Sequence, residues 1–313
     1  MKPASIISLI VAVFIVVGGI ITCNVAQRMA DESGQSIFSE IESGEDNTRL
    51  FEFGDAKINK ILLDLENAEI TVIGGAEKSY IEFINFKDNY YSLTSTSSLV
   101  SFDETPDITA MLTFWESGFS FKGIRYMLNV NKDDTDHTAK KEVKIHLTGD
   151  STVKQIEINA STCTINVSNI ATDTDYFITA DNITLNTANL MTSSALNINT
   201  GKDIPAAKSV IFNSDLDYIT NININAEHLQ FTAKSFMCSG NASINCESGY
   251  VNLESGGNMK FDLTSETGSI FVNSAPVTSP CTVGTSGGSV NITAKSADIN
   301  VTTGALTNQT VNN

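Results

Sequence analysis

The residues with the most chemical potential in this chain are two closely spaced pairs of aspartates. Asp215 and Asp217 stand in the segment SDLDY, and Asp173 and Asp175 stand in TDTDY. Residues two apart on a strand share a face, so each pair resembles the two carboxylates that a glycosidase holds roughly 5–10 Å apart. Neither pair has a nearby cluster of Arg, Lys or His to bind an acidic sugar, and both also fit turns. We therefore predict no catalytic residue, and retain Asp215 and Asp217 only as candidate calcium ligands.

The sequence also lacks the motifs of a metal site, a catalytic nucleophile and a phosphate-binding loop. The histidines His137, His146 and His228 are far apart in sequence, which disfavours a metal site. The chain has no G-x-S-x-G elbow and no phosphate-binding loop, and its glycine-rich pieces fit turns. No cofactor is predicted.

Five cysteines are present in an arrangement that matches no zinc or redox motif: Cys23, Cys163, Cys238, Cys246 and Cys281. The last four lie within or near apolar–polar alternations, which favours small buried hydrophobic side chains over disulfides. Cys238–Cys246 is the one pairing that merits a test.

The charge of the chain excludes one class of partner. The formal net charge is −17, and only three arginines occur, none of them after Arg125. Nucleic-acid binding needs a basic stripe, and this sequence has none. The acidity indicates a solvated surface that disfavours flat contact with anionic lipid.

An apolar run at the N-terminus predicts a membrane anchor. Ser5–Cys23 carries no charge over 19 residues, about the length that crosses a ~30 Å hydrocarbon core. Lys2 precedes the run and many acidic residues follow it, which predicts an N-terminus inside and an exported remainder. A cleaved signal peptide and a lipoprotein signal ending at Cys23 are the alternatives. We expect a single-pass protein of the cell membrane with an extracytoplasmic C-terminal part.

The chain divides into four parts. Residues 1–26 hold the anchor, 27–48 form an acidic juxtamembrane linker, 49–152 an N-terminal β region and 153–313 a repetitive part. The β region contains an aromatic insert at 106–128 with the only tryptophan, Trp115. With Phe119 and Phe121 it is either a plug at one end of a β-stack or an aromatic interaction surface.

The repetitive part predicts an all-β fold. Apolar-x-apolar pairs such as Ile165/Val167, Ile183/Leu185 and Ile222/Ile224 recur among Asn, Ser, Thr and Gly, and several recur about every 20 residues. A unit this short cannot bury its apolar face alone, so stacking is required. We predict a β-solenoid, with a β-sandwich as the rival.

Asparagine supports the stacked arrangement. It recurs beside apolar strand positions, where amides can hydrogen-bond along a stack and tolerate tight turns. The positions are Asn166, Asn186, Asn223, Asn245, Asn252 and Asn291.

The segments Ile61–Ile73, Val143–Leu147 and Val153–Val167, behind an N-terminal span, resemble a known family. The likeness is to the bacterial putative-adhesin domain of unknown function, whose members are envelope proteins, and it covers about residues 50–313. The resemblance implies a single-stranded β-helix-like fold, supplies no catalytic residues and places some members near envelope-stress signalling systems.

Three functions follow as hypotheses. The first is a non-catalytic cell-envelope interaction module whose partner is an envelope protein, a glycan or another cell. The second is an accessory protein that modulates a membrane sensor during envelope stress. The third, suggested only by the fold, is a carbohydrate-active β-helix enzyme.

Overall fold

The computed structural model describes residues 48–86, 91–104, 140–190, 194–201, 203–284 and 287–303. These residues form an all-β architecture, which confirms the predicted class. Three predicted segments lie outside the described residues. They are the anchor at 5–23, the linker at 27–48 except for its last residue, and the aromatic insert at 106–128. Across the described ranges, no helix is both long and apolar enough to span a membrane.

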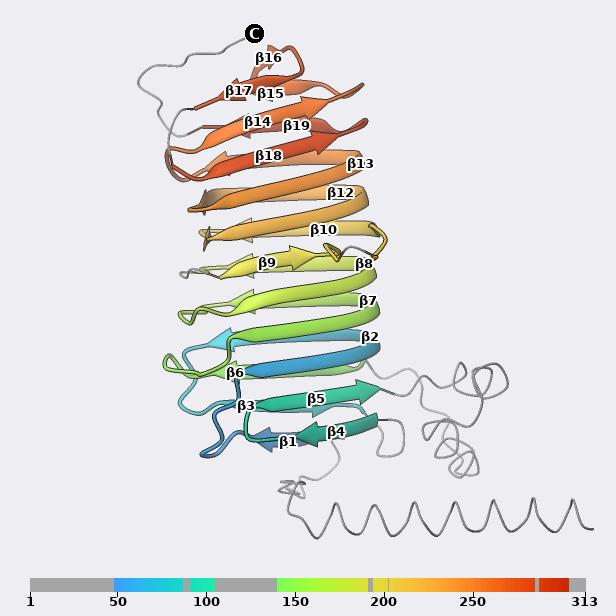
Figure 1. The fold of residues 1–313 in the computed structure, drawn as a ribbon, viewed down its shortest axis with the longest axis vertical. Helices are drawn as coiled ribbons and strands as arrows, with labels where there is room; N and C mark the ends of the chain where they lie inside the picture. Colours follow the sequence, from blue (N-terminus) through green and yellow to red (C-terminus); the bar gives the residue numbers. More distant parts are fainter. Residues whose placement is uncertain are drawn as a thin grey trace, which may run out of the picture.

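Nineteen strands in the described residues stack along the long axis of the molecule (Figure 1). They are β1 (Thr48–Glu52), β2 (Lys60–Gly74), β3 (Tyr80–Ile84), β4 (Tyr91–Ser95), β5 (Leu99–Glu104), β6 (Glu142–Leu147), β7 (Gln155–Ser168), β8 (Asp175–Ala188), β9 (Ala195–Ile198), β10 (Ala207–Asp215), β11 (Tyr218–Ile219), β12 (Asn221–Cys238), β13 (Asn241–Ser255), β14 (Lys260–Ser265), β15 (Ile270–Val272), β16 (Ala275–Val277), β17 (Cys281–Val283), β18 (Ser289–Ala294) and β19 (Asp298–Thr302).

The long strands turn through a bend, as β12 and β13 show in Figure 1. Each therefore contributes one segment before the bend and one after it, and we call this pair of segments a rung. We call the outward side of the segments before the bend the leading face. The outward side of the segments after the bend is the trailing face. Neighbouring rungs pair in parallel, with Gln155 beside Asp175 and Ile165 beside Leu185, so the pairing partners lie 20 residues apart.

The core consists of side chains that stack from rung to rung. One column follows the leading segments, and all its members are buried: Leu63, Ile158, Ile178, Ile198, Ile224, Ile244, Ile292 and Leu263. A second column, after the bend, includes Phe212 and Phe231, whose rings stack with centroids 4.6 Å apart. Burial of each large apolar side chain stabilises the fold by about 1.5–3 kcal/mol.

The order of rungs departs from the order of the sequence at both ends. β2 lies between β7 on one side and β5 with β6 on the other. At the far end, β18 and β19 lie between β13 and the pair β14 and β15. The first and last rungs along the chain are therefore inserted between others, an arrangement that repeat spacing alone does not predict.

Antiparallel strands cover both ends of the stack. β4 pairs with β5, β3 with β6 and β1 with β3 at one end, while β17 pairs with β14 and β16 with β15 at the other. An outermost parallel strand would otherwise present unpaired backbone groups to other chains. The described strands β1, β3, β4, β16 and β17 supply these caps.

An ion pair between a buried glutamate and a partly exposed lysine joins the chain on either side of residues 105–139. Glu104 ends β5 and is 6% exposed, and its carboxylate pairs with Lys141 just before β6. The same carboxylate accepts a hydrogen bond from the backbone N–H of Glu66 at 2.9 Å. The described chain on either side of residues 105–139 is thus held together at Glu104 and Lys141.

Candidate functional site

The two aspartates proposed as calcium ligands do not share a face. Asp215 ends β10 and is exposed, whereas Asp217 is 1% exposed. Leu216 between them has a φ of 57°, in the left-handed region, and this reverses the strand alternation. The prediction that both lie on one strand face was wrong, and no group of three His, Cys, Asp or Glu able to hold a metal occurs in the described residues.

Asp217 instead organises the chain around it. Its carboxylate accepts hydrogen bonds from the Thr187 hydroxyl, from the Ser214 hydroxyl at 2.7 Å and from the Leu190 backbone N–H at 2.9 Å. Burial raises the pKa of Asp217 above its usual value, although these three hydrogen bonds oppose the shift. The residue therefore ties neighbouring rungs together, and its oxygens already have partners.

The predicted interaction surface Trp115, Phe119 and Phe121 lies outside the described residues. Among the described residues, Phe177 is an exposed aromatic, 37% exposed, on the leading face of β8. Sequence reasoning missed it, although the signal was present. In Tyr176-Phe177-Ile178 an aromatic occupies the position where strand alternation calls for a polar residue.

The cysteines and histidines of the described part lie apart from one another. Cys163, Cys238, Cys246 and Cys281 are buried and free, as the alternation favoured, and Cys238 and Cys246 form no disulfide. His146 stacks on Tyr80 with centroids 4.3 Å apart beside a small open pocket. His228 hydrogen-bonds Ser248 on the adjacent strand at 3.1 Å.

Amides bridge successive rungs on the trailing face. Asn166 donates to Glu69 at 2.8 Å, Asn186 to Asn166 at 2.9 Å, and Asn213 to Asn186 at 2.9 Å. This confirms that stacked asparagines bond along the axis for Asn166 and Asn186. The same holds for Asn223, which donates to Asn197 at 2.7 Å, and for Asn252, which accepts from Asn300 at 2.9 Å. The bonds use the polar groups internally, so this ladder stabilises the stack.

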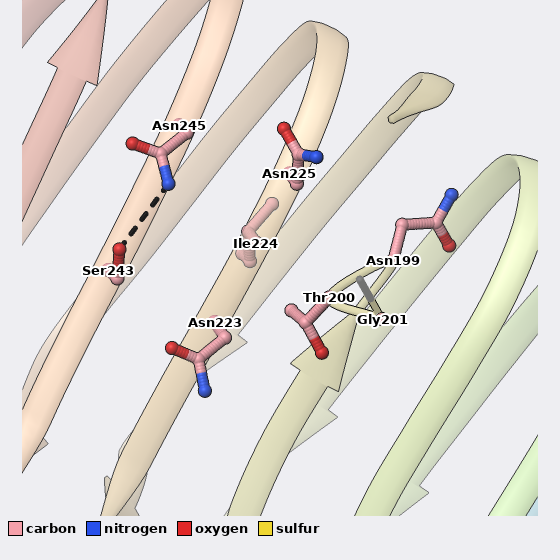
Figure 2. Close-up of a pocket in the computed structure, with 8 residues that line it drawn as sticks. All are labelled: Asn199, Thr200, Gly201, Asn223, Ile224, Asn225, Ser243 and Asn245. Atoms are coloured by element: carbon pink, nitrogen blue, oxygen red, sulfur yellow. Dashed lines mark hydrogen bonds between the residues drawn. The ribbon is translucent and has the colours of Figure 1, made fainter. Parts of the chain in front are cut away.

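One rung in the middle of the stack is split. β7, β8, β12 and β13 run through the bend as single strands, but β9 stops at Ile198 and β10 begins at Ala207. β9 pairs with β8 and with β12, so the ladder of the leading segments continues through it, but β9 ends before the bend that the neighbouring strands run through. Figure 2 shows Asn199, Thr200 and Gly201 leaving β9 beside the longer strands.

A cavity of about 510 Å³ opens to solvent at this split. The described residues of its lining are neutral and carry amide and hydroxyl groups, with no Asp, Glu, His, Lys or Arg among them: Asn199, Thr200, Gly201, Asn223, Ile224, Asn225, Ser243 and Asn245 (Figure 2). Asn223 uses one amide hydrogen on Asn197 at 2.7 Å, and Asn245 donates to Ser243 at 3.4 Å. The arrangement offers hydrogen bonds to a neutral ligand, but its lining has no pair of carboxylates for acid–base hydrolysis.

Comparison with known proteins finds likeness in shape alone. No family model and no curated protein matches the chain. Among solved structures, a "putative cell adhesion protein" from Clostridium sporogenes is similar at 11% identity and a TM-score of 0.32, over 83% of this chain and 99% of the other. A "putative adhesin" from Parabacteroides merdae is similar at 13% identity and a TM-score of 0.28, over 84% and 98%. A "putative lipid binding protein" from Parabacteroides distasonis is similar at 11% identity and a TM-score of 0.26, over 84% and 98%.

Proposed function

We propose that this chain is a non-catalytic interaction module of a bacterial cell envelope. Its stack is a β-solenoid, anchored through residues 5–23 and exposed outside the cytoplasmic membrane. It presents a long polar surface to a glycan or to another envelope protein.

The observation that carries this proposal is the contrast between the two kinds of surface on one rigid stack. On the trailing face, the amides of Asn166, Asn186 and Asn213 bond to one another in a ladder along the axis. On the leading face, the split rung leaves amides and hydroxyls lining an open cavity. A preorganised strand scaffold with free polar groups suits binding, because little ordering accompanies association.

Binding to envelope material tests the proposal. The full chain, purified in detergent, is mixed with isolated cell-wall and membrane fractions of the source cells and sedimented. Saturable co-sedimentation with one fraction is the expected result. The heat-unfolded chain is the control for non-specific adhesion, and equal sedimentation of the folded and unfolded protein, or none of either, would overturn the proposal.

The orientation is tested separately. An epitope tag at the C-terminus should bind antibody on spheroplasts without permeabilisation, as expected for an extracytoplasmic stack. Labelling only after permeabilisation would contradict the predicted topology. Crosslinked capture of a single membrane sensor in place of wall material would favour the accessory signalling role.

A further inference from the structure

The split rung and the leading face around it form a continuous uncharged surface on a strongly acidic protein. From β9 to β18 the described outward positions before the bend carry no charge: Ala195, Asn197, Asn221, Asn223, Asn225, Asn241, Ser243, Asn245, Ser289, Asn291 and Thr293. Charged residues return at Asp175 on one side and at Lys260 and Asp262 on the other. They return also at the exposed Glu227 and Glu247, where β12 and β13 bend. With a net charge of −17, the chain has placed its charges elsewhere.

The groups on this surface can exchange hydrogen bonds in both directions. An amide has two donor hydrogens and an acceptor oxygen, and a hydroxyl has one donor and two acceptor sites. No described residue hydrogen-bonds the Asn225 side chain, which lies half-buried in the cavity lining. Asn223 and Asn245 donate to Asn197 and Ser243, and no described residue donates to their side-chain oxygens. Such mixed donors and acceptors match the vicinal hydroxyls of a sugar.

An exposed aromatic ring lies in line with these amides. Phe177 pairs with Asn197 on the next strand, and Asn197 pairs with Asn223 on the one after, so the three share one outward column. Ser243 continues the column on β13. With strands ~4.8 Å apart, Phe177 lies ~14 Å from Ser243 along the axis. An apolar platform beside a few fixed polar groups is the usual composition of a small-ligand site.

The lack of charge selects among ligands. Between Phe177 and Ser243, an acidic sugar or a phosphorylated headgroup would find no cation in this column, and a basic peptide would find no carboxylate. The first carboxylate beyond Phe177 is that of Glu157, on β7. A neutral saccharide needs neither. Its hydroxyls can meet the amides while the C–H face of one ring packs on Phe177.

We infer that the cavity at the split rung, extended along the leading face to Phe177, binds a neutral oligosaccharide of about three or four sugars. This deepens the proposed function by naming a ligand class and a site, and it rests on that function. The chain positions the ligand by Asn223, Asn225 and Asn245 at the cavity and by Phe177 at the other end.

The test uses the full chain in detergent micelles and calorimetric titration with neutral tetrasaccharides (maltotetraose, cellotetraose, mannotetraose and chitotetraose) and acidic tetragalacturonate. The expected result is binding of at least one neutral probe and none of the acidic one. Phe177→Ala and Asn225→Ala should each weaken that binding at least tenfold. Tyr250→Ala and Asn182→Ala are matched controls, because both residues are exposed outward on the trailing segments and should leave binding unchanged.

Three outcomes would overturn the inference: no neutral probe binds, tetragalacturonate binds equally well, or both leading-face variants bind as tightly as the parent chain. Unchanged melting temperatures of the variants exclude unfolding as the cause of any loss. If the parent and both variants co-sediment equally with an envelope fraction, the proposed function stands while this site fails. If the parent chain binds no envelope fraction at all, the proposed function fails first.

Discussion

Asn199 binds both backbone groups of Ala180 with its side chain. The Asn199 Oδ1 accepts from the Ala180 N–H at 3.2 Å, and Nδ2 donates to the Ala180 carbonyl at 3.2 Å. In the neighbouring rungs, a strand residue would offer its own N–H and C=O at this level. One amide therefore replaces a missing piece of strand, and it does so from a left-handed backbone with a φ of 46° that asparagine tolerates. The split can then exist without leaving the backbone of β8 unpaired.

Removing this amide should destabilise the stack. Asn199→Ala leaves two buried backbone groups unpaired and places alanine at a positive φ, so we expect a loss of about 2–4 kcal/mol in the free energy of unfolding. Asn199→Gly relieves the backbone strain and separates the two effects. Urea denaturation measures both, and an Asn199→Ala chain as stable as the parent would contradict the assignment.

The buried carboxylate of Asp217 should matter in a similar way. Asp217→Ala removes the acceptor of three donors, from Thr187, Ser214 and Leu190, and should cost about 2–4 kcal/mol. Asp217→Asn keeps one oxygen for the Leu190 N–H and should cost less. Thermal melting of the two variants compares them, and Asp215→Asn, at an exposed neighbour, is the control that should change little.

The pH dependence of stability has a defined sign at Asp217. Burial raises the pKa of Asp217 in the folded chain, so the folded state holds this proton more tightly than the unfolded state. The resulting stabilisation is present below the unfolded pKa of ~3.9 and is lost as the pH rises through the folded pKa. The stability of the parent relative to Asp217→Asn should therefore be greater at pH 4 than at pH 7. An unchanged or reversed difference would contradict it.

Amide bonding between rungs predicts unequal effects along the ladder. Asn186 both donates to Asn166 and accepts from Asn213, so Asn186→Ala breaks two bonds and should cost about 1–2 kcal/mol. Asn213→Ala breaks one of the two and should cost about half as much. Equal costs in urea denaturation would indicate that the amides act independently of the ladder.

The buried thiols should resist reagents until the chain unfolds. Burial raises the pKa of Cys163 to about 12 and that of Cys246 to about 11, so neither forms the reactive thiolate at neutral pH. In a Cys23→Ser chain at pH 8, a thiol reagent should label almost nothing in the native state and four thiols in guanidinium. Rapid labelling of the native chain would contradict the burial of the thiols. If the mass of the unfolded chain did not rise on labelling without reductant, the cysteines would not be free.

The sequence predicted the core because stacking repeats the same local pattern. The pairs Ile165/Val167, Ile183/Leu185 and Ile222/Ile224 are buried as their alternation required. The order of the outer rungs was not predictable from the sequence. The alternation of apolar and polar residues around Ile244 resembles that around Ile292, so it does not indicate which rungs are neighbours. Pairing of β13 with β18 depends on long-range packing.

The candidate site was less predictable because it arises where the repeat fails. Asp217 belongs to a segment typical of a turn, and only the left-handed Leu216 turns its carboxylate inward. Asn199 resembles its neighbours in sequence, yet it stands where β9 ends short of the bend. Asn245 was predicted to bond along the stack, but it donates to Ser243 on its own strand. The composition of the sequence therefore did not identify which asparagines bond to a neighbouring rung.

The inserted rungs at both ends have a mechanical consequence. A protein tethered at one end and attached to a partner elsewhere carries tension. Beyond β1, a pull on the N-terminal end reaches β2, which is hydrogen-bonded along both of its edges. A pull on the C-terminal end reaches β19 and then β18, which are also hydrogen-bonded along both edges. β1 is an outermost strand and can be peeled off, but β2 at one end and β18 with β19 at the other cannot. Their extraction must break two ladders at once and should require more force than unwinding a stack built in sequence order.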